Sequence, residues 1–114
     1  MTQQLATIVY PVKDLHKAKA LYGALLGTSP AQDNPYYVGF QIGNQQFGLD
    51  PNGHSKGLNG PTTFWTVSDI RQSVQMLLEA GATLVQDVTD VGGGMLMASV
   101  KDADDNDIGL LQNP

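Results

Sequence analysis

An internal repeat constrains this chain more than any other feature of its sequence. Residues 8–15 align with residues 63–70, and each stretch is a run of β-branched and aromatic residues that leads to an aspartate, Asp14 or Asp69. Such a run is typical of a strand, and an Asp side chain caps a helix N-terminus by accepting a backbone N–H. The sequence therefore predicts two copies of one unit that begins with a strand followed by a helix.

The segment after each capping Asp has apolar residues at helical spacing. In the first copy the predicted apolar face is formed by Leu15, Ala18, Leu21, Tyr22 and Leu25. In the second copy it is formed by Ile70, Ser73, Val74, Met76, Leu77 and Ala80. Gly27 and Gly81 follow the two segments, where a glycine commonly ends a helix. Both helices are thus predicted to pack one face on a sheet.

Three short strand-like runs follow each predicted helix. They cover residues 28–30, 36–42 and 45–49 in the first copy, and residues 83–85, 95–100 and 107–111 in the second. Gly43 and Asn44 are suited to the hairpin turn between two of them. We therefore expect an α+β protein of one domain, residues 1–114, with two βαβββ modules at 1–50 and 62–114. The glycine-rich segment 51–61 is expected to be the crossover.

Composition narrows the classes of function. The chain has 114 residues, no Cys, and a formal net charge of −5 from six basic and eleven acidic residues. The missing Cys excludes thiolate chemistry and disulfides, and the negative charge disfavours nucleic-acid phosphates. No apolar run approaches the roughly 20 residues that span a bilayer, and the N-terminus lacks a basic leader. We expect a cytoplasmic protein with neither a nucleic-acid nor a membrane partner.

Several of these segments together resemble the vicinal oxygen chelate superfamily, which includes glyoxalase I, bleomycin-resistance proteins and extradiol dioxygenases. They are the strand with Val12-Lys13-Asp14-Leu15, the helix ending Leu26-Gly27, and the closing segment 102–111, which is similar to a divergent Asp-Pro-Asp-Gly-Asn-x-x-Glu-Leu. The resemblance covers nearly the whole chain. It implies that the two modules form a half-open barrel of curved mixed sheet, with the helices outside and a ligand cleft on the concave face.

The resemblance also implies where metal-dependent members hold their metal. One ligand stands seven residues before each capping Asp and one in the last strand of each module, and these positions hold Thr7, Thr62, Gly48 and Gly109. Catalytic Zn, Ni and Fe prefer His nitrogen and carboxylate oxygen. We therefore expect no metal and no cofactor, and neither metal-dependent glyoxalase I nor extradiol dioxygenase activity.

Two loops could each form a binding site, but each is also explained as an ordinary turn or loop. Residues 102–107 begin like a calcium-binding loop, yet the glycine and the glutamate that such a loop requires are missing, so we expect a solvated hairpin turn. Gly92, Gly93 and Gly94 either allow a ligand to approach the backbone closely or simply let the loop bend. The sequence leaves these two alternatives open.

Strand alternation assigns side chains to the expected cleft. If Thr7 and Thr62 face it, Val9 and Phe64 do so too, while Tyr10 and Trp65 face the helices. The residues predicted to bind a ligand are Thr7, Val9, Tyr37, Phe40, Gly48, Asp50, Thr62, Phe64, Met95, Met97 and Gly109. This set is mostly apolar, with hydroxyls and a carboxylate.

The first hypothesis is a metal-independent protein that binds a small apolar or cationic organic molecule, as bleomycin-resistance proteins do. An alternative is a lyase or isomerase of the same fold that uses Asp50, His54 or a Tyr for acid–base chemistry. A third is an interaction module without a ligand. Because a half-open sheet leaves edges that a two-fold partner covers, a homodimer is expected.

Overall fold

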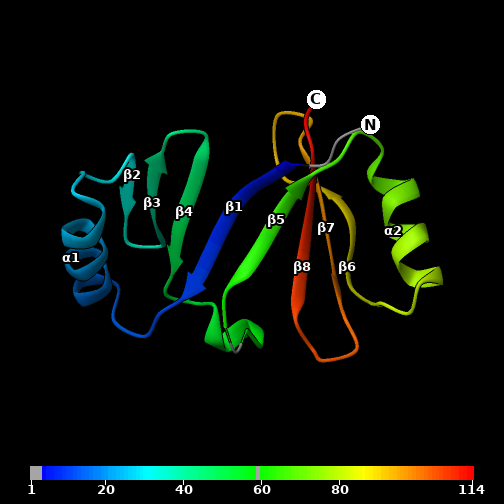
Figure 1. Ribbon diagram of the computed structural model, residues 1–114, viewed down its shortest axis with the longest axis horizontal. Coiled ribbons are helices and arrows are strands. Elements are labelled where there is room, and N and C mark those ends of the chain that lie inside the picture. Colours follow the sequence, from blue (N-terminus) through cyan, green and yellow to red (C-terminus); the bar gives the residue numbers. More distant parts are fainter. Residues whose placement is uncertain (1–3, 59) are drawn as a thin grey trace. The chain divides into compact units, whose positions relative to one another are not determined.

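The computed structural model describes residues 4–58 and 60–114, which form two compact units (Figure 1). From here on, module one is Thr7–Pro61, and module two is Thr62–Pro114 together with residues 4–6. Each unit combines one α-helix with open mixed sheet, so the predicted α+β class with two βαβββ modules is confirmed.

Module one follows the predicted order of elements. They are β1 (Gln4–Pro11), of which residues 7–11 lie in this module, α1 (Leu15–Leu26), β2 (Gln32–Asn34), β3 (Tyr37–Ile42), β4 (Gln45–Asp50) and a short 3₁₀ helix, η1 (His54–Lys56). The strands lie in the order β2-β3-β4-β1, with β1 parallel to β4 and the other pairs antiparallel. Gly43, with a φ of 58°, turns the hairpin between β3 and β4 as predicted.

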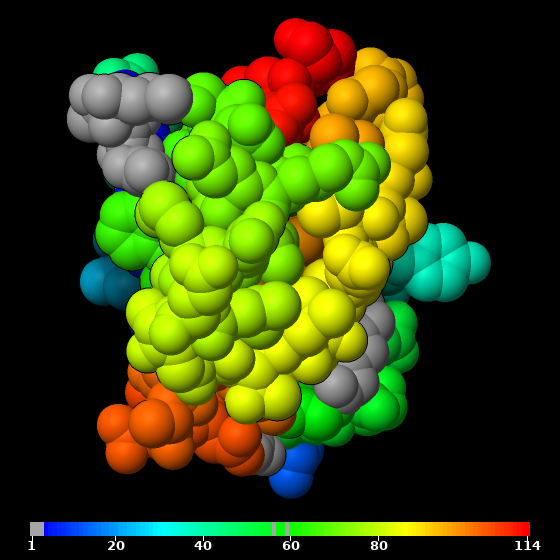
Figure 2. All heavy atoms as spheres, turned by 90° about the vertical axis from the view of Figure 1, so that its right-hand side faces the viewer, coloured from blue at the N-terminus to red at the C-terminus, as the bar shows by residue number. Residues whose placement is uncertain are grey.

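Module two repeats this plan. Its elements are β5 (Thr62–Thr66), α2 (Ile70–Glu79), β6 (Thr83–Asp90), β7 (Leu96–Lys101) and β8 (Asp107–Gln112). The strand order is β5-β8-β7-β6, and β5 runs parallel to β8 as β1 runs parallel to β4. In Figure 2 the side chains of α2 and β6, in yellow-green and yellow, make up much of the surface nearest the viewer.

The predicted helix caps are confirmed in both modules. The Asp14 side chain accepts the Lys17 backbone N–H at 3.0 Å, and the Asp69 side chain accepts that of Gln72 at 3.1 Å. Gly27 takes the left-handed conformation, with a φ of 67°, at the end of α1. These local signals place each helix directly after the first strand of its module.

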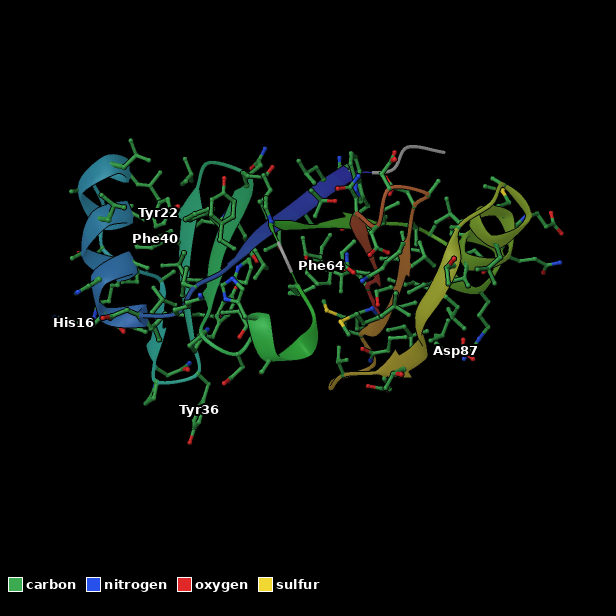
Figure 3. The ribbon with its side chains drawn as sticks, turned by 90° about the horizontal axis from the view of Figure 1, so that it is seen from below. His16, Tyr22, Tyr36, Phe40, Phe64 and Asp87 are labelled. Atoms are coloured by element: carbon green, nitrogen blue, oxygen red, sulfur yellow. The ribbon has the colours of Figure 1, made fainter. Side chains whose placement is uncertain are left out.

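Each helix covers one face of its own sheet. In module one, α1 packs on Val38, Phe40 and Leu49, and Figure 3 shows Tyr22 and Phe40 between the helix and the strands. In module two, α2 packs on a core of Val67, Ile70, Val74, Ala98 and Leu110. Tyr10 and Trp65 lie against these cores, so their predicted orientation toward the helices is confirmed.

Two local predictions are wrong. The strand expected at residues 28–30 lies at β2 instead, where Gln32 pairs with Gly39; Pro30 has no N–H to donate to a ladder. On α1, Leu21 and Leu25 are 66% and 73% exposed. The helix instead buries the side that carries Leu15, Ala18, Tyr22 and Leu26, so these two leucines turn to solvent.

Within the described ranges, no helix has both the length and the apolar character that crossing a membrane requires.

Candidate functional site

Most of the predicted ligand-binding residues lie on the sheet surface turned away from the helix of their own module. We call this surface the distal face. Because Val38, Leu49, Ala98 and Leu110 point into the cores, their strand neighbours point the other way. In module one these are Thr7, Val9, Tyr37, Gly48 and Asp50. In module two they are Thr62, Phe64, Met97 and Gly109.

Two predicted residues lie elsewhere. Phe40 is 1% exposed, and its ring belongs to the core under α1, so the structure places it on the helix side of the sheet. The physical reason is that residues three apart in a strand, such as Tyr37 and Phe40, point to opposite faces. Met95 lies in the turn between β6 and β7, where its N–H donates to the Gly92 carbonyl at 3.1 Å.

The Tyr37 ring lies directly over Gly48. A Cβ atom at Gly48 would stand 2.5 Å from Cζ and 2.7 Å from Cε1 of Tyr37, distances that real Cβ atoms do not tolerate. A Cβ atom at Gly39 would also approach the same ring, at 3.0 Å from Cε2. The glycines of β3 and β4 therefore form a seat for the tyrosine ring.

The chemistry of Tyr37 follows from this position. Burial raises the pKa of its phenol above the ordinary value of 10.0, and the negative charge of Asp50 raises that pKa further. Asp50 itself accepts the Asn52 backbone N–H at 2.8 Å. The phenol therefore stays protonated at neutral pH and can donate a hydrogen bond from the distal face.

A small polar pocket adjoins this ring. It measures about 60 Å³ and is lined by Ala31, Gln32, Tyr37, Gly39, Phe40, Gln41 and Gln46. The Thr7 hydroxyl donates to Oε1 of Gln46 at 3.3 Å, which orients that amide. The distal face of module one thus offers amide and hydroxyl groups around an aromatic ring.

The distal face of module two has the same seat with different chemistry. The Phe64 ring lies over Gly109, where a Cβ atom would stand 2.5 Å from Cε1 of the ring. Met97 pairs with Leu111 on the neighbouring strands, so these two side chains share the same face as Phe64. Apolar groups replace the amides of module one.

Thr62 carries an unusual hydroxyl. The residue is 5% exposed, and within the part of the chain that the structure describes its Oγ1 is buried without a hydrogen-bond partner. An unsatisfied buried polar group costs about 1–3 kcal/mol. Thr62 is the first residue of β5. It lies two residues before Phe64, so both side chains point to the same face of the sheet.

The residues at the four positions discussed above do not fit a metal centre. Gly48 and Gly109 are covered by aromatic rings, and the Thr7 hydroxyl is engaged by Gln46. Among the residues that the structure describes, no three His, Asp or Glu side chains lie close enough together to hold a metal ion. His54 lies exposed in η1, and His16 lies exposed on α1 (Figure 3).

The acidic segment before β8 is a hairpin turn, as predicted. The Asp102 carboxylate accepts the backbone N–H groups of Asp104 and Asn106, both at 2.9 Å, and the Asn106 side-chain amide at 3.0 Å. These hydrogen bonds, that of the Asn106 side chain foremost, hold the pKa of Asp102 below its ordinary value. The Asp102 carboxylate therefore holds the backbone of this turn.

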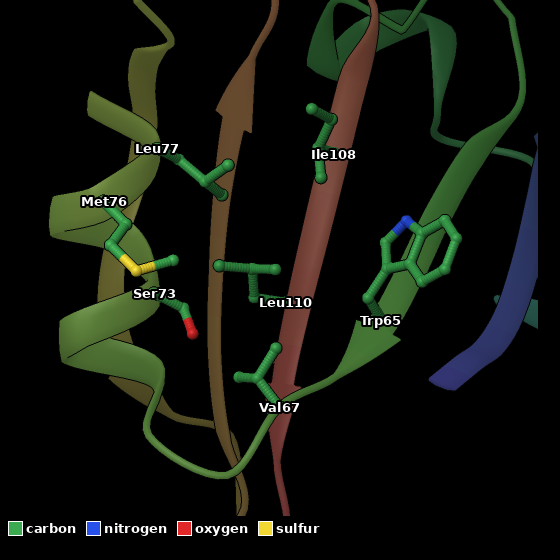
Figure 4. A pocket seen from close by; sticks show the side chains of 7 residues that line it. All are labelled: Trp65, Val67, Ser73, Met76, Leu77, Ile108 and Leu110. Atoms are coloured by element: carbon green, nitrogen blue, oxygen red, sulfur yellow. The ribbon is translucent and has the colours of Figure 1, made fainter. Parts of the chain in front are cut away.

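A larger pocket was not predicted from the sequence, because the ligand site was expected on the other face of the sheet. This pocket lies on the helix side of module two. It measures about 260 Å³ and is lined by Trp65, Val67, Ser73, Met76, Leu77, Ile108 and Leu110 (Figure 4). The repeat does contain a signal for this pocket. In the alignment of the two copies, the aromatic residues Tyr22 and Phe47 of module one correspond to the smaller aliphatic residues Leu77 and Ile108.

Comparison with known proteins adds a family and a fold. The model of the Glyoxalase/Bleomycin resistance protein/Dioxygenase superfamily matches residues 4–110. No functionally curated protein matches the sequence significantly.

Several solved structures share the fold. One is a superfamily member from Vibrio splendidus 12B01, with 15% identity over 98% of this chain and 100% of that one, and a TM-score of 0.76. Another, named an NAD-dependent benzaldehyde dehydrogenase from Legionella pneumophila, has 15% identity over 99% and 100% and a TM-score of 0.74. Methylmalonyl-CoA epimerase from Mycobacterium tuberculosis has 17% identity over 96% and 87% and a TM-score of 0.68. At such identities the likeness shows the fold alone.

Proposed function

This chain belongs to the Glyoxalase/Bleomycin resistance protein/Dioxygenase superfamily, and on that premise we propose that it binds a small organic molecule on its distal faces without a metal ion. The observation that supports this most is the pair of aromatic rings seated on glycines. Tyr37 covers Gly48, and Phe64 covers Gly109. In each module, metal-dependent relatives are expected to have a metal-binding side chain at this position. Here the position is a glycine, and an aromatic ring lies over it.

The surroundings of these rings favour a flat ligand that is apolar or positively charged. Tyr37 and Phe64 are both half-buried, so part of each ring is available for contact with a planar group. The carboxylate of Asp50 and the net charge of −5 favour a cation over an anion. The protonated Tyr37 phenol offers a polar contact that fixes the orientation of the ligand.

A thermal-shift screen of cationic aromatic compounds tests this proposal. A ligand that binds only the folded chain raises the melting temperature, by an amount that grows with its concentration. Tyr37→Ala and Phe64→Ala are expected to weaken the shift at least fivefold in apparent affinity. Tyr36→Ala is the matched control, because Tyr36 is 75% exposed and its neighbour Tyr37 is not.

Two results would overturn the proposal. One is a screen with no ligand-dependent shift, and the other is binding that disappears when a chelator removes divalent ions. The second result would mean that a metal ion takes part despite the glycines at positions 48 and 109.

A second candidate function, an acid–base lyase or isomerase, is favoured by the proximity of Tyr37 and Asp50. A protonated phenol beside a carboxylate pairs a proton donor with a proton acceptor. If the chain turns over a ligand found in the screen, Asp50→Asn is expected to lower the turnover number at least tenfold, beyond any loss of affinity for the ligand. Turnover that is unaffected by Asp50→Asn and His54→Ala would exclude this candidate.

The homodimer remains a prediction. Size-exclusion chromatography with light scattering at rising concentration measures it directly. A chain that neither dimerises nor binds any compound in the screen would favour the interaction module instead.

A further inference from the structure

The pocket beneath α2 has the size and lining of a site for a small aromatic molecule. About 260 Å³ lies between α2 and strands β5 and β8, and every lining side chain except Ser73 is apolar (Figure 4). Apolar cavities of about 150 Å³ already bind benzene. The pocket lies on the helix side of the sheet, so it is separate from the distal face of module two.

The repeat shows what the same space holds in module one. When Asp14 is aligned with Asp69 and Gly48 with Gly109, each lining residue has a counterpart: Tyr10, Val12, Ala18, Leu21, Tyr22, Phe47 and Leu49. The rings of Tyr22 and Phe47 stand 5.0 Å apart between centroids, and both contact Tyr10, at 5.7 Å and 5.0 Å. Aromatic rings of the chain itself fill the space under α1.

Module two lacks two of these rings. Leu77 stands where Tyr22 would be and Ile108 where Phe47 would be, while Trp65 keeps an aromatic wall in place of Tyr10. The Trp65 indole is held in orientation because its Nε1–H donates to the Thr63 hydroxyl at 3.1 Å. The two smaller side chains, Leu77 and Ile108, therefore leave a pocket under α2.

One polar group enters the lining at a position that is apolar in module one. Ser73 takes the place of Ala18, and the part of the chain that the structure describes supplies no hydrogen-bond partner for its hydroxyl. Met76, 54% exposed, forms the outer rim. The lining thus provides an aromatic wall, aliphatic sides and a single hydroxyl.

We propose that this pocket binds a small aromatic molecule, of one or two rings with one polar substituent, whose ring takes the place of the Tyr22 and Phe47 rings of module one. The ring packs against Trp65 in the edge-to-face manner of the aromatic contacts in module one. Its polar substituent exchanges a hydrogen bond with Ser73. A phenol meets these requirements, and so does an indole.

The test uses p-cresol and toluene, the analogues of the Tyr and Phe side chains, with the full chain. Trp65 is the only tryptophan in the sequence, so tryptophan fluorescence and the indole N–H resonance can both be assigned to this lining residue. Both probes are expected to give saturable changes at Trp65, p-cresol more tightly than toluene. No saturable change at Trp65 would overturn the proposal.

A filled pocket provides the decisive control. Leu77→Tyr with Ile108→Phe introduces the residues that module one uses, and it is expected to weaken p-cresol at least tenfold without lowering the melting temperature. If the double variant does not fold, Ile108→Phe alone is expected to weaken p-cresol at least threefold. Unchanged affinity in the folded filled variant would overturn the proposal.

Two further variants separate this site from its neighbours. Ser73→Ala is expected to weaken p-cresol about fivefold and to leave toluene unchanged. Phe64→Ala, on the distal face, is expected to leave p-cresol unchanged, so the two sites can fail independently. If the probes bind only after a dimer dissociates, a second copy of the chain covers the pocket and the proposal is wrong.

Discussion

The two modules follow one backbone plan but fill the two faces of their sheets in opposite ways. Module one packs its helix side with aromatic rings and presents amides, a phenol and a carboxylate on its distal face. Module two leaves a pocket under its helix and presents Phe64, Met97 and Leu111 on its distal face. The repeat thus fixes the architecture, while the specific chemistry comes from positions at which its copies differ.

The largest expected effect compares the cores at one equivalent position. Phe40 and Val100 correspond, because the residues that precede them, Gly39 and Ser99, pair with Gly48 and Gly109. Both are fully buried, at 1% and 0% exposure. Phe40→Ala is expected to lower the free energy of unfolding by about 4 kcal/mol and Val100→Ala by about 2 kcal/mol, measured by urea denaturation. Equal losses would contradict a difference in packing between the two cores at this position.

The next effect concerns the glycine seats. Gly48→Ala and Gly109→Ala place a Cβ atom against the Tyr37 and Phe64 rings, and each is expected to cost about 1–3 kcal/mol of unfolding free energy. Gly60→Ala is the control, because a Cβ atom there meets nothing within 4 Å, and it is expected to change stability by less than about 0.5 kcal/mol. If Gly48→Ala behaves like Gly60→Ala, the seat in module one is not tight.

A smaller effect tests what the modules share. Asp14→Ala and Asp69→Ala each remove a helix cap, and each is expected to cost about 1 kcal/mol of unfolding free energy. Asp104→Ala, at an exposed turn position, serves as the control for charge removal and should have almost no effect. Clearly unequal losses at Asp14 and Asp69 would show that the two helices depend on their caps to different degrees.

The smallest effect depends on pH and belongs to module one alone. Because the Tyr37 pKa is raised in the folded chain, the unfolded chain loses this proton at lower pH than the folded one. The contribution to stability is therefore complete below pH 10.0 and is lost as the pH rises through the higher folded pKa. Tyr37→Phe is expected to make the melting temperature fall less steeply above that pH, whereas Tyr36→Phe is not. Identical slopes for the two variants would contradict the raised pKa.

The features that the sequence predicted well are those with short-range signals. The caps at Asp14 and Asp69, the left-handed Gly27 and the Gly43 turn each depend on residues close in the chain, so their patterns are readable without a structure. Strand alternation also placed Tyr10 and Trp65 correctly on the helix sides. The same rule, applied from Tyr37, assigns the Phe40 ring to the core, where the structure places it.

The site features that the sequence missed depend on distances between segments. Nothing in the order of residues states that the Tyr37 ring folds onto Gly48, because that requires one particular side-chain rotamer across two strands. The pocket under α2 likewise depends on how far the helix stands from β5 and β8. Leu77 and Ile108 replace aromatic residues of module one, which indicates that less side-chain volume lies under α2. The sequence does not tell whether the helix moves closer to the sheet and fills that space.

The adjacent residues Tyr36 and Tyr37 differ in one more respect, their reactivity toward covalent reagents. Iodination and nitration proceed through the phenolate, so the half-buried Tyr37, with its raised pKa, is expected to be protected, while Tyr36 is 75% exposed and points away from its module (Figure 3). Because the chain has no Cys, Tyr36 provides a natural point of attachment for a label. Such a label would be attached next to Tyr37, which lines the small polar pocket.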